Sequence, residues 1–160
     1  MIKGFKIYRP GVGFYLAAAS LVLAIAAFVL YGMTFSAFGY DTERWVVALM
    51  TIALWGYACI LVNGLLFGNA RAATDIMYVI DAFCVTLALI KFLIPCLSPI
   101  GIYFTVHNMG DVERNAIGVP RSIVGVVFFV LTIVTLVTSA FFSISSRKHE
   151  ADGSKAEVAE

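Results

Sequence analysis

The sequence predicts an all-α membrane protein, a bundle of four transmembrane helices, and three observations support this fold class. Hydrophobic residues make up 61% of the 160 residues, and charged residues only 13%. The mean hydropathy is +0.95, whereas a soluble domain is about half apolar and about a quarter charged. The apolar residues also form four runs, each close to the ~20 residues that cross a bilayer. We therefore expect the lipid bilayer to surround one domain, residues 1–146.

The four predicted spans are residues 13–33, 45–67, 76–94 and 123–143. The first follows the basic segment KGFKIYRPG and could be a signal peptide. Its apolar run is about 20 residues long and only a weak cleavage site follows, so we expect a retained span. The short turn GNARAATD joins the second and third spans into a hairpin. After the fourth, residues 147–160 are too polar to form a core and are expected to be a solvated tail.

Lysine and arginine residues predict the orientation, because cytoplasmic flanks carry an excess of them. The N-terminal flank, the connection between spans two and three and the tail carry seven: Lys3, Lys6, Arg9, Arg71, Arg147, Lys148 and Lys155. The opposite connections carry three: Arg44, Arg114 and Arg121. We therefore expect both termini in the cytoplasm. The short loops and small size favour a multi-pass protein of a bacterial cell membrane, with an organelle membrane as the alternative.

Three polar residues lie inside the predicted spans. Asp81 and Lys91 are about 15 Å apart along the third span and face about 80° apart, so they cannot pair. The long stem of Lys91 lets its ammonium group reach the outer headgroups. Asp81 is short and should face the bundle interior, where Asn63 of the second span is the expected hydrogen-bond partner. Further candidates for contact with Asp81 are Arg9, Arg71 and Tyr78.

Asp81 has two interpretations. An ionisable group inside a span is a hypothesis for a proton or cation site. It can also be a buried polar contact that aligns helices near the cytoplasmic edge. No second carboxylate lies in the predicted spans, which favours the structural interpretation.

The segment 95–120 is predicted to be a long apolar outer loop between the third and fourth spans. Pro95 and Pro99 should end or kink the helix, because proline lacks an amide donor. Long loops in compact domains are usually functional or disordered, and this one is too apolar for disorder. We expect it to form a short helix, to lie at the interface or to be covered by protein, and to act as a partner-binding or lid element. Its apolar anchors would be four side chains: Ile100, Ile102, Tyr103 and Phe104.

Small residues mark faces on which helices can approach closely. In the first span they form one helical stripe: Gly13, Ala17, Ser20, Ala24 and Ala27. Such a stripe can pack inside the bundle or against a second protein. The expected partners are the lipid bilayer and either another membrane protein or a second copy of the chain.

The composition argues against several classes of function. No basic stretch with interleaved aromatic residues indicates nucleic-acid binding. The three cysteines, Cys59, Cys84 and Cys96, form no CxxC pair, so neither a zinc site nor a dithiol centre is predicted. We predict no cofactor, no metal site and no catalytic residues.

Two functions remain open. The favoured one is an accessory or interaction subunit of a larger membrane or surface-attached partner, which binds through helix faces and residues 95–120. The alternative is a small oligomeric transporter or channel that uses Asp81 and Lys91.

Overall fold

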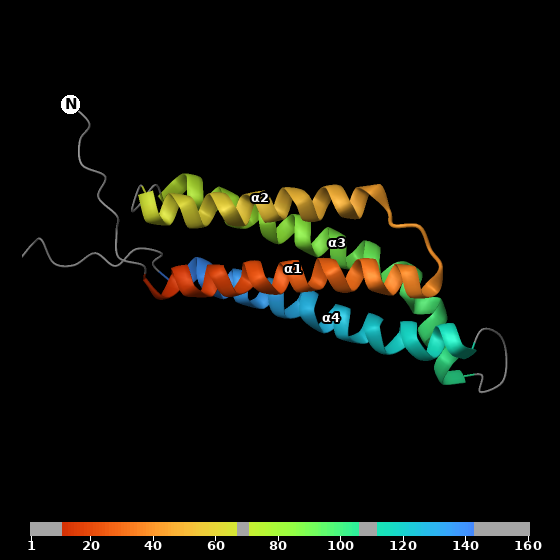
Figure 1. Ribbon diagram of the computed structural model, residues 1–160. Coiled ribbons are helices and arrows are strands. Elements are labelled where there is room, and N and C mark those ends of the chain that lie inside the picture. The colour runs from red at the N-terminus through yellow and green to blue at the C-terminus, as the bar shows by residue number, and fades with distance from the viewer. Residues whose placement is uncertain (1–10, 67–70, 106–111, 143–160) are drawn as a thin grey trace, which may run out of the picture.

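The computed structural model describes residues 11–66, 71–105 and 112–142. These residues form four helices, α1 (Val12–Phe38), α2 (Arg44–Leu66), α3 (Arg71–Thr105) and α4 (Val112–Phe141) (Figure 1). All four are long and apolar enough to cross a membrane. The structure thus confirms the all-helical fold class and indicates a multi-pass membrane protein. The sides on which the termini lie stay a prediction, and the basic N-terminal flank and the tail lie outside the described residues.

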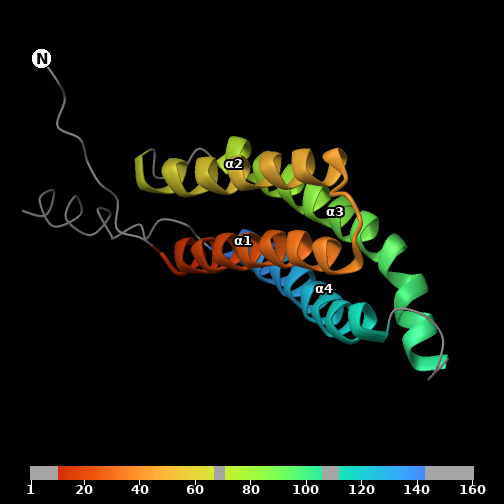
Figure 2. The ribbon, with the colours of Figure 1, turned by 45° about the vertical axis from the view of Figure 1, so that its right-hand side comes forward.

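The helices pack as a closed ring of four, in which neighbours in the chain are neighbours in space. α1 packs most extensively on α4, and α2 on α3, while α3 also contacts α4 and α1 contacts α2. The α1–α2 contact is the smallest of these four interfaces. Figures 1 and 2 show α2 and α3 on one side of the bundle and α1 and α4 on the other. The bundle therefore consists of two helix pairs, α1/α4 and α2/α3, which meet at a seam.

The stripe of small residues in α1 lies inside the bundle. All five of its members are buried: Gly13, Ala17, Ser20, Ala24 and Ala27. Small side chains allow two helix backbones to approach closely. This stripe is therefore used within the chain.

The connection between α1 and α2 is held by local hydrogen bonds. Gly39 ends α1 in the left-handed conformation, with φ 71°, and its amide donates to Ser36 O over 3.2 Å. The Tyr40 amide donates to Phe35 O over 2.9 Å, which completes a common helix C-terminal motif. Just before α2, the Glu43 amide donates to the Tyr31 hydroxyl over 2.8 Å. A buried side chain of α1 therefore positions the start of α2.

The structure differs most from the sequence prediction over residues 95–120. α3 continues through Pro95 and Pro99 to Thr105, and α4 begins at Val112 and contains Pro120. Residues 95–105 and 112–120 of the predicted outer loop are thus helical, and residues 106–111 lie outside the described residues. Figure 2 shows α3 bending toward its C-terminal end, as expected where proline removes helix hydrogen bonds.

The position of Pro95 explains why the helix survives. A proline deprives the carbonyl four residues earlier of its hydrogen bond, and that carbonyl belongs to Lys91. The Lys91 side chain is 50% exposed and lies near a charged carboxylate. A released carbonyl at this polar level can be satisfied by water, whereas in hydrocarbon it would be costly.

A layer of aromatic rings closes the core near the α1–α2 connection. Phe92 is fully buried, and its ring centroid lies 5.9 Å from that of Tyr31, 6.3 Å from Phe35 and 5.6 Å from Phe129. These rings come from α1, α3 and α4. Offset and edge-to-face arrangements at such distances are favourable, so Phe92 joins three helices in one cluster.

We predict that Phe92→Ala lowers the stability of the bundle by about 1–3 kcal/mol, because packing contacts are lost but little burial from water is at stake in a lipid environment. Thermal unfolding in one lipid or detergent condition measures the effect. The matched control is Phe83→Ala on the same helix, where the ring is 64% exposed. Equal losses in the two variants would contradict the proposed role of the aromatic layer.

Candidate functional site

The candidate site is built around Asp81, the one acidic residue that the described part of the chain buries completely. Its exposed fraction is 0%, and neither carboxyl oxygen has a hydrogen-bond partner among the described residues. Most buried polar groups in proteins are hydrogen-bonded. A carboxyl group without a partner, inside a helix that can cross a membrane, therefore needs a specific explanation.

Gly56 of α2 makes room for the Asp81 carboxyl. A Cβ atom at position 56 would lie 2.6 Å from Asp81 Oδ2 and closer still to Oδ1. Only glycine avoids this overlap, so the carboxyl group rests directly against the backbone of α2. The sequence analysis missed this role, although Gly56 is the kind of small residue that allows close helix approach.

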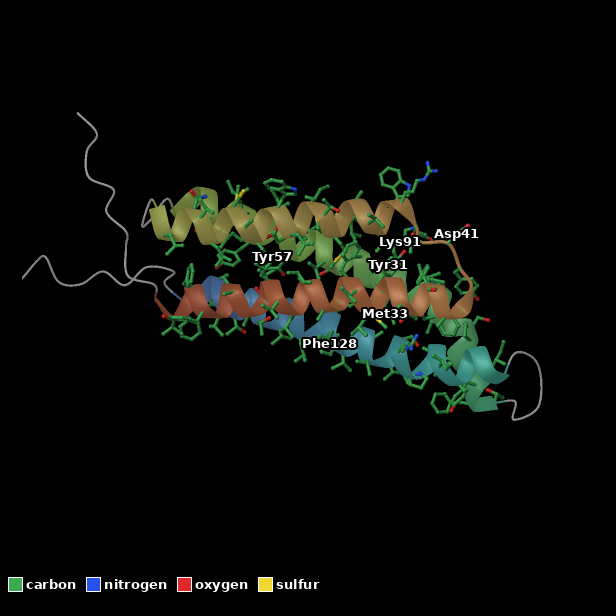
Figure 3. All side chains as sticks on the ribbon, viewed as in Figure 1. Tyr31, Met33, Asp41, Tyr57, Lys91 and Phe128 are labelled. Atoms are coloured by element: carbon green, nitrogen blue, oxygen red, sulfur yellow. The ribbon has the colours of Figure 1, made fainter. Side chains whose placement is uncertain are left out.

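Two tyrosine hydroxyls lie near the carboxyl group. Tyr57 of α2 is fully buried and Tyr78 of α3 is 6% exposed, and neither hydroxyl has a hydrogen bond of good geometry to the described residues. Each lies close to a serine on the other helix pair, Tyr57 to Ser20 of α1 and Tyr78 to Ser139 of α4. Figure 3 shows Tyr57 directed from α2 toward α1. We call these five residues the Asp81 cluster.

The two serines are oriented by their own helices. The Ser20 hydroxyl donates to Ala17 O over 2.8 Å, and the Ser139 hydroxyl donates to Leu136 O over 2.7 Å. Their hydrogens are therefore engaged, and only their lone pairs remain to face the tyrosines. All four helices thus contribute an oxygen to the Asp81 cluster.

The predicted hydrogen bond between Asn63 and Asp81 is wrong. The Asp81 oxygens have no hydrogen-bond partner in the described structure, and the carboxyl lies against Gly56, seven residues before Asn63 on α2. The reason is helix length. α3 begins at Arg71, so Asp81 lies nearly three turns inside it, whereas the prediction placed it little more than one turn from the membrane edge.

Lys91 lies away from the Asp81 cluster. Its ammonium nitrogen is 3.8 Å from Glu43 Oε2, and the two side chains are 50% and 42% exposed. Figure 3 shows Lys91 near the connection between α1 and α2. This placement agrees with a lysine whose stem follows the helix surface and whose charge reaches a polar layer. An exposed pair of this kind contributes little stability, about 0–1 kcal/mol.

The predicted partner-binding residues lie on the last turns of α3. Ile102, Tyr103 and Phe104 are 43%, 40% and 69% exposed, while Ile100 is partly buried against the core. The rings of Tyr103 and Phe104 contact edge to face, with centroids 5.4 Å apart. Ile102, Tyr103 and Phe104 thus make the end of α3 apolar and exposed, and we call these three residues the α3 end surface.

Comparisons with known proteins add no family to this description. No family model matches the chain, and neither a curated protein nor a solved structure shows significant similarity to it. The function is therefore argued from the Asp81 cluster and the α3 end surface.

We predict that Gly56→Ala destabilises the protein by about 1–3 kcal/mol, because the added methyl group overlaps the Asp81 carboxyl and forces α2 and α3 apart. The cost should fall when Asp81→Ala is present as well, since the overlap then disappears. A double-mutant cycle by thermal unfolding measures this coupling, expected at about 0.5–3 kcal/mol.

Gly32→Ala is the matched control for the same substitution, because a Cβ at position 32 meets no atom within 4 Å. It should leave stability unchanged or slightly raised, as alanine is the better helix former. Additive effects of the changes at positions 56 and 81 would contradict the contact between them.

Proposed function

We propose that the protein is an interaction subunit of the membrane, which associates with a larger membrane or surface-attached protein through the α3 end surface. The observation that carries this proposal is the exposed apolar end of α3, which follows the exposed Lys91–Glu43 pair along the helix.

The first support is the length of α3. At 1.5 Å per residue its 35 residues extend over about 52 Å, well beyond the ~30 Å of a hydrocarbon core. Arg71, where the helix begins, and Lys91 are 20 residues apart, or about 30 Å. We infer that the stretch between them crosses the lipid and that Lys91 with Glu43 lies at its edge.

The second support is the position of the remaining helix. From Lys91 to Thr105, α3 continues for about 21 Å measured along a helix. Figure 2 shows this end of α3 lying beyond the connection between α1 and α2. On this placement, Ile102 and Phe104 lie outside the hydrocarbon core.

The third support is the chemistry of the α3 end surface. The two contacting aromatic rings and the Ile102 side chain are apolar, and outside the lipid they would be exposed to water at a free-energy cost. Tyrosine and phenylalanine are enriched in the centres of protein interfaces. A partner protein that covers this surface with apolar side chains of its own removes that cost.

The alternative proposal, a small oligomeric transporter or channel, is favoured by one observation, the buried Asp81 carboxyl. Lys91 does not add to a transport path through Asp81, because its side chain is exposed beside Glu43 and lies ten residues from Asp81 on α3. A transporter would therefore depend on the Asp81 cluster alone.

The test is purification of the tagged full chain in a gentle detergent from its native membrane, followed by quantitative mass spectrometry. We expect one partner at stoichiometric yield, and we expect Tyr103→Ser with Phe104→Ser to reduce that yield at least about tenfold, the equivalent of ~1.4 kcal/mol. The matched control, Tyr103→Phe with Phe104→Leu, keeps the surface apolar and should retain the partner.

Two results would overturn the proposal. A partner that remains bound to the serine variant would show that the α3 end surface is not the contact. A chain that purifies only with copies of itself would favour the transporter.

A further inference from the structure

A second inference concerns the Asp81 cluster. It does not depend on a partner protein or on the α3 end surface, and it shares with the proposed function only the inferred membrane placement of residues 71–91. We propose that Asp81 is a proton-binding site at the seam between the helix pairs α1/α4 and α2/α3. The ligand is a single proton on the carboxyl group, and the hydroxyls of Tyr57 and Tyr78 are its polar surroundings.

The absence of a countercharge among the described side chains is the first argument. The titratable groups that face Asp81 are Tyr57 from α2 and Tyr78 and Cys84 from its own helix α3. From α1 and α4, the described residues nearest the cluster offer only the hydroxyls of Ser20 and Ser139. None of these groups is a cation. An ionised carboxylate buried here would lose its hydration without an ionic partner, at a cost of several kcal/mol.

The lack of hydrogen bonds argues against a purely structural role. A buried aspartate that fastens two helices would accept hydrogen bonds from one of them. Both oxygens of Asp81 are without such bonds in the described structure, and a backbone CH₂ group of Gly56 lies against them. The carboxyl group therefore forms no hydrogen bond that would attach α3 to α2, although Gly56 leaves room for it. A neutral acid can occupy this space without the cost of burying a charge.

The continuity of the helices favours a proton over an alkali-metal ion. In membrane proteins such ions are commonly held by backbone carbonyls of unwound helix segments. α2 and α3 are unbroken helices on both sides of Gly56 and Asp81. Their carbonyls are engaged in the helices, and a proton needs only the carboxyl oxygen.

The depth of the site supports a functional interpretation. Asp81 is ten residues from Arg71 and ten from Lys91, or about 15 Å from each end of the stretch that we infer to cross the lipid. This places it near the middle of the membrane, where ionisable residues are most costly and most often functional.

Loss of the proton has a structural consequence at the seam. The Asp81 cluster bridges the two helix pairs, since Tyr57 and Tyr78 on one pair approach Ser20 and Ser139 on the other. The α1–α2 interface beside it is the smallest of the ring. A charge created here is relieved when the seam opens to water, so deprotonation should loosen α1 from α2.

The experiment is infrared spectroscopy of the full chain in lipid vesicles, recorded at about pH 7, where an ordinary aspartate with a pKa of about 3.9 is ionised. The C=O stretch of a protonated carboxyl group reports the acid form directly and needs no access by a reagent. We expect one such band, lost in Asp81→Asn and retained in Asp75→Asn. Asp75 is the matched control, an exposed aspartate on the same helix.

The band should vanish reversibly as the pH is raised, and replacing KCl by NaCl at constant pH should leave it unchanged. Circular dichroism verifies that the Asp81→Asn variant is folded. We expect it to fold because aspartate and asparagine side chains are nearly equal in size. The absence of a band that depends on Asp81 at about pH 7 would overturn the proposal. Loss of the band on adding sodium would also overturn it, in favour of a sodium site. Neither result depends on a partner protein, so this test and the copurification test fail independently.

Discussion

The bilayer imposes two limits on this chain, a hydrocarbon core about 30 Å thick and a solvent without hydrogen bonds, and the fold follows from both. Four helices satisfy their backbone internally. α3 is longer than the core is thick, and its two prolines occur only after Lys91. Pro95 removes the helix hydrogen bond to the Lys91 carbonyl, and it does so at the level where the exposed Lys91 and Glu43 side chains indicate water. Asp81 is unusual under these two limits, because its carboxyl group is buried far from the level of Lys91 and Glu43.

The contact between Gly56 and Asp81 links the two themes of the structure, close helix packing and buried polarity. Without a side chain at position 56, α2 and α3 approach closely enough for the carboxyl to be sealed from solvent. In lipid, association of helices depends on such close packing, since lipid chains are as apolar as leucine. A polar group held at this contact makes the packing of the bundle sensitive to charge. The α3 end surface, in contrast, would act outside the lipid and independently of that site.

Much of the helical structure could be predicted from the sequence, because long apolar runs in lipid leave the backbone few alternatives. The predicted spans 13–33 and 45–67 lie within or close to α1 and α2. The extent of α3 could not be predicted in this way, since proline usually ends a helix and its tolerance here depends on the surroundings of Lys91. The error in helix length carried over to the depth of Asp81 and to the choice of Asn63 as its partner.

The polar neighbours of Asp81 were only partly predictable. Tyr78 was a candidate because it lies one turn from Asp81 on the same helix. Tyr57, Ser20 and Ser139 come from three other helices, and their convergence depends on how the ring closes and on the rotation of each helix. A signal was present in Gly56, whose lack of a side chain marks a place where something approaches α2. What approaches it is determined by the register between α2 and α3, which the hairpin sequence alone does not specify.

The most direct test of the membrane placement is a spin-label accessibility scan along α3, with labels at Phe83, Ile90, Ile102 and Phe104 in a chain whose three cysteines are replaced. Collisions with dissolved oxygen report lipid, and collisions with a polar nickel reagent report water. The account predicts oxygen access at positions 83 and 90 and nickel access at 102 and 104. Labels at 102 and 104 that are as shielded from nickel as those at 83 would contradict it, because the end of α3 would then lie in the lipid.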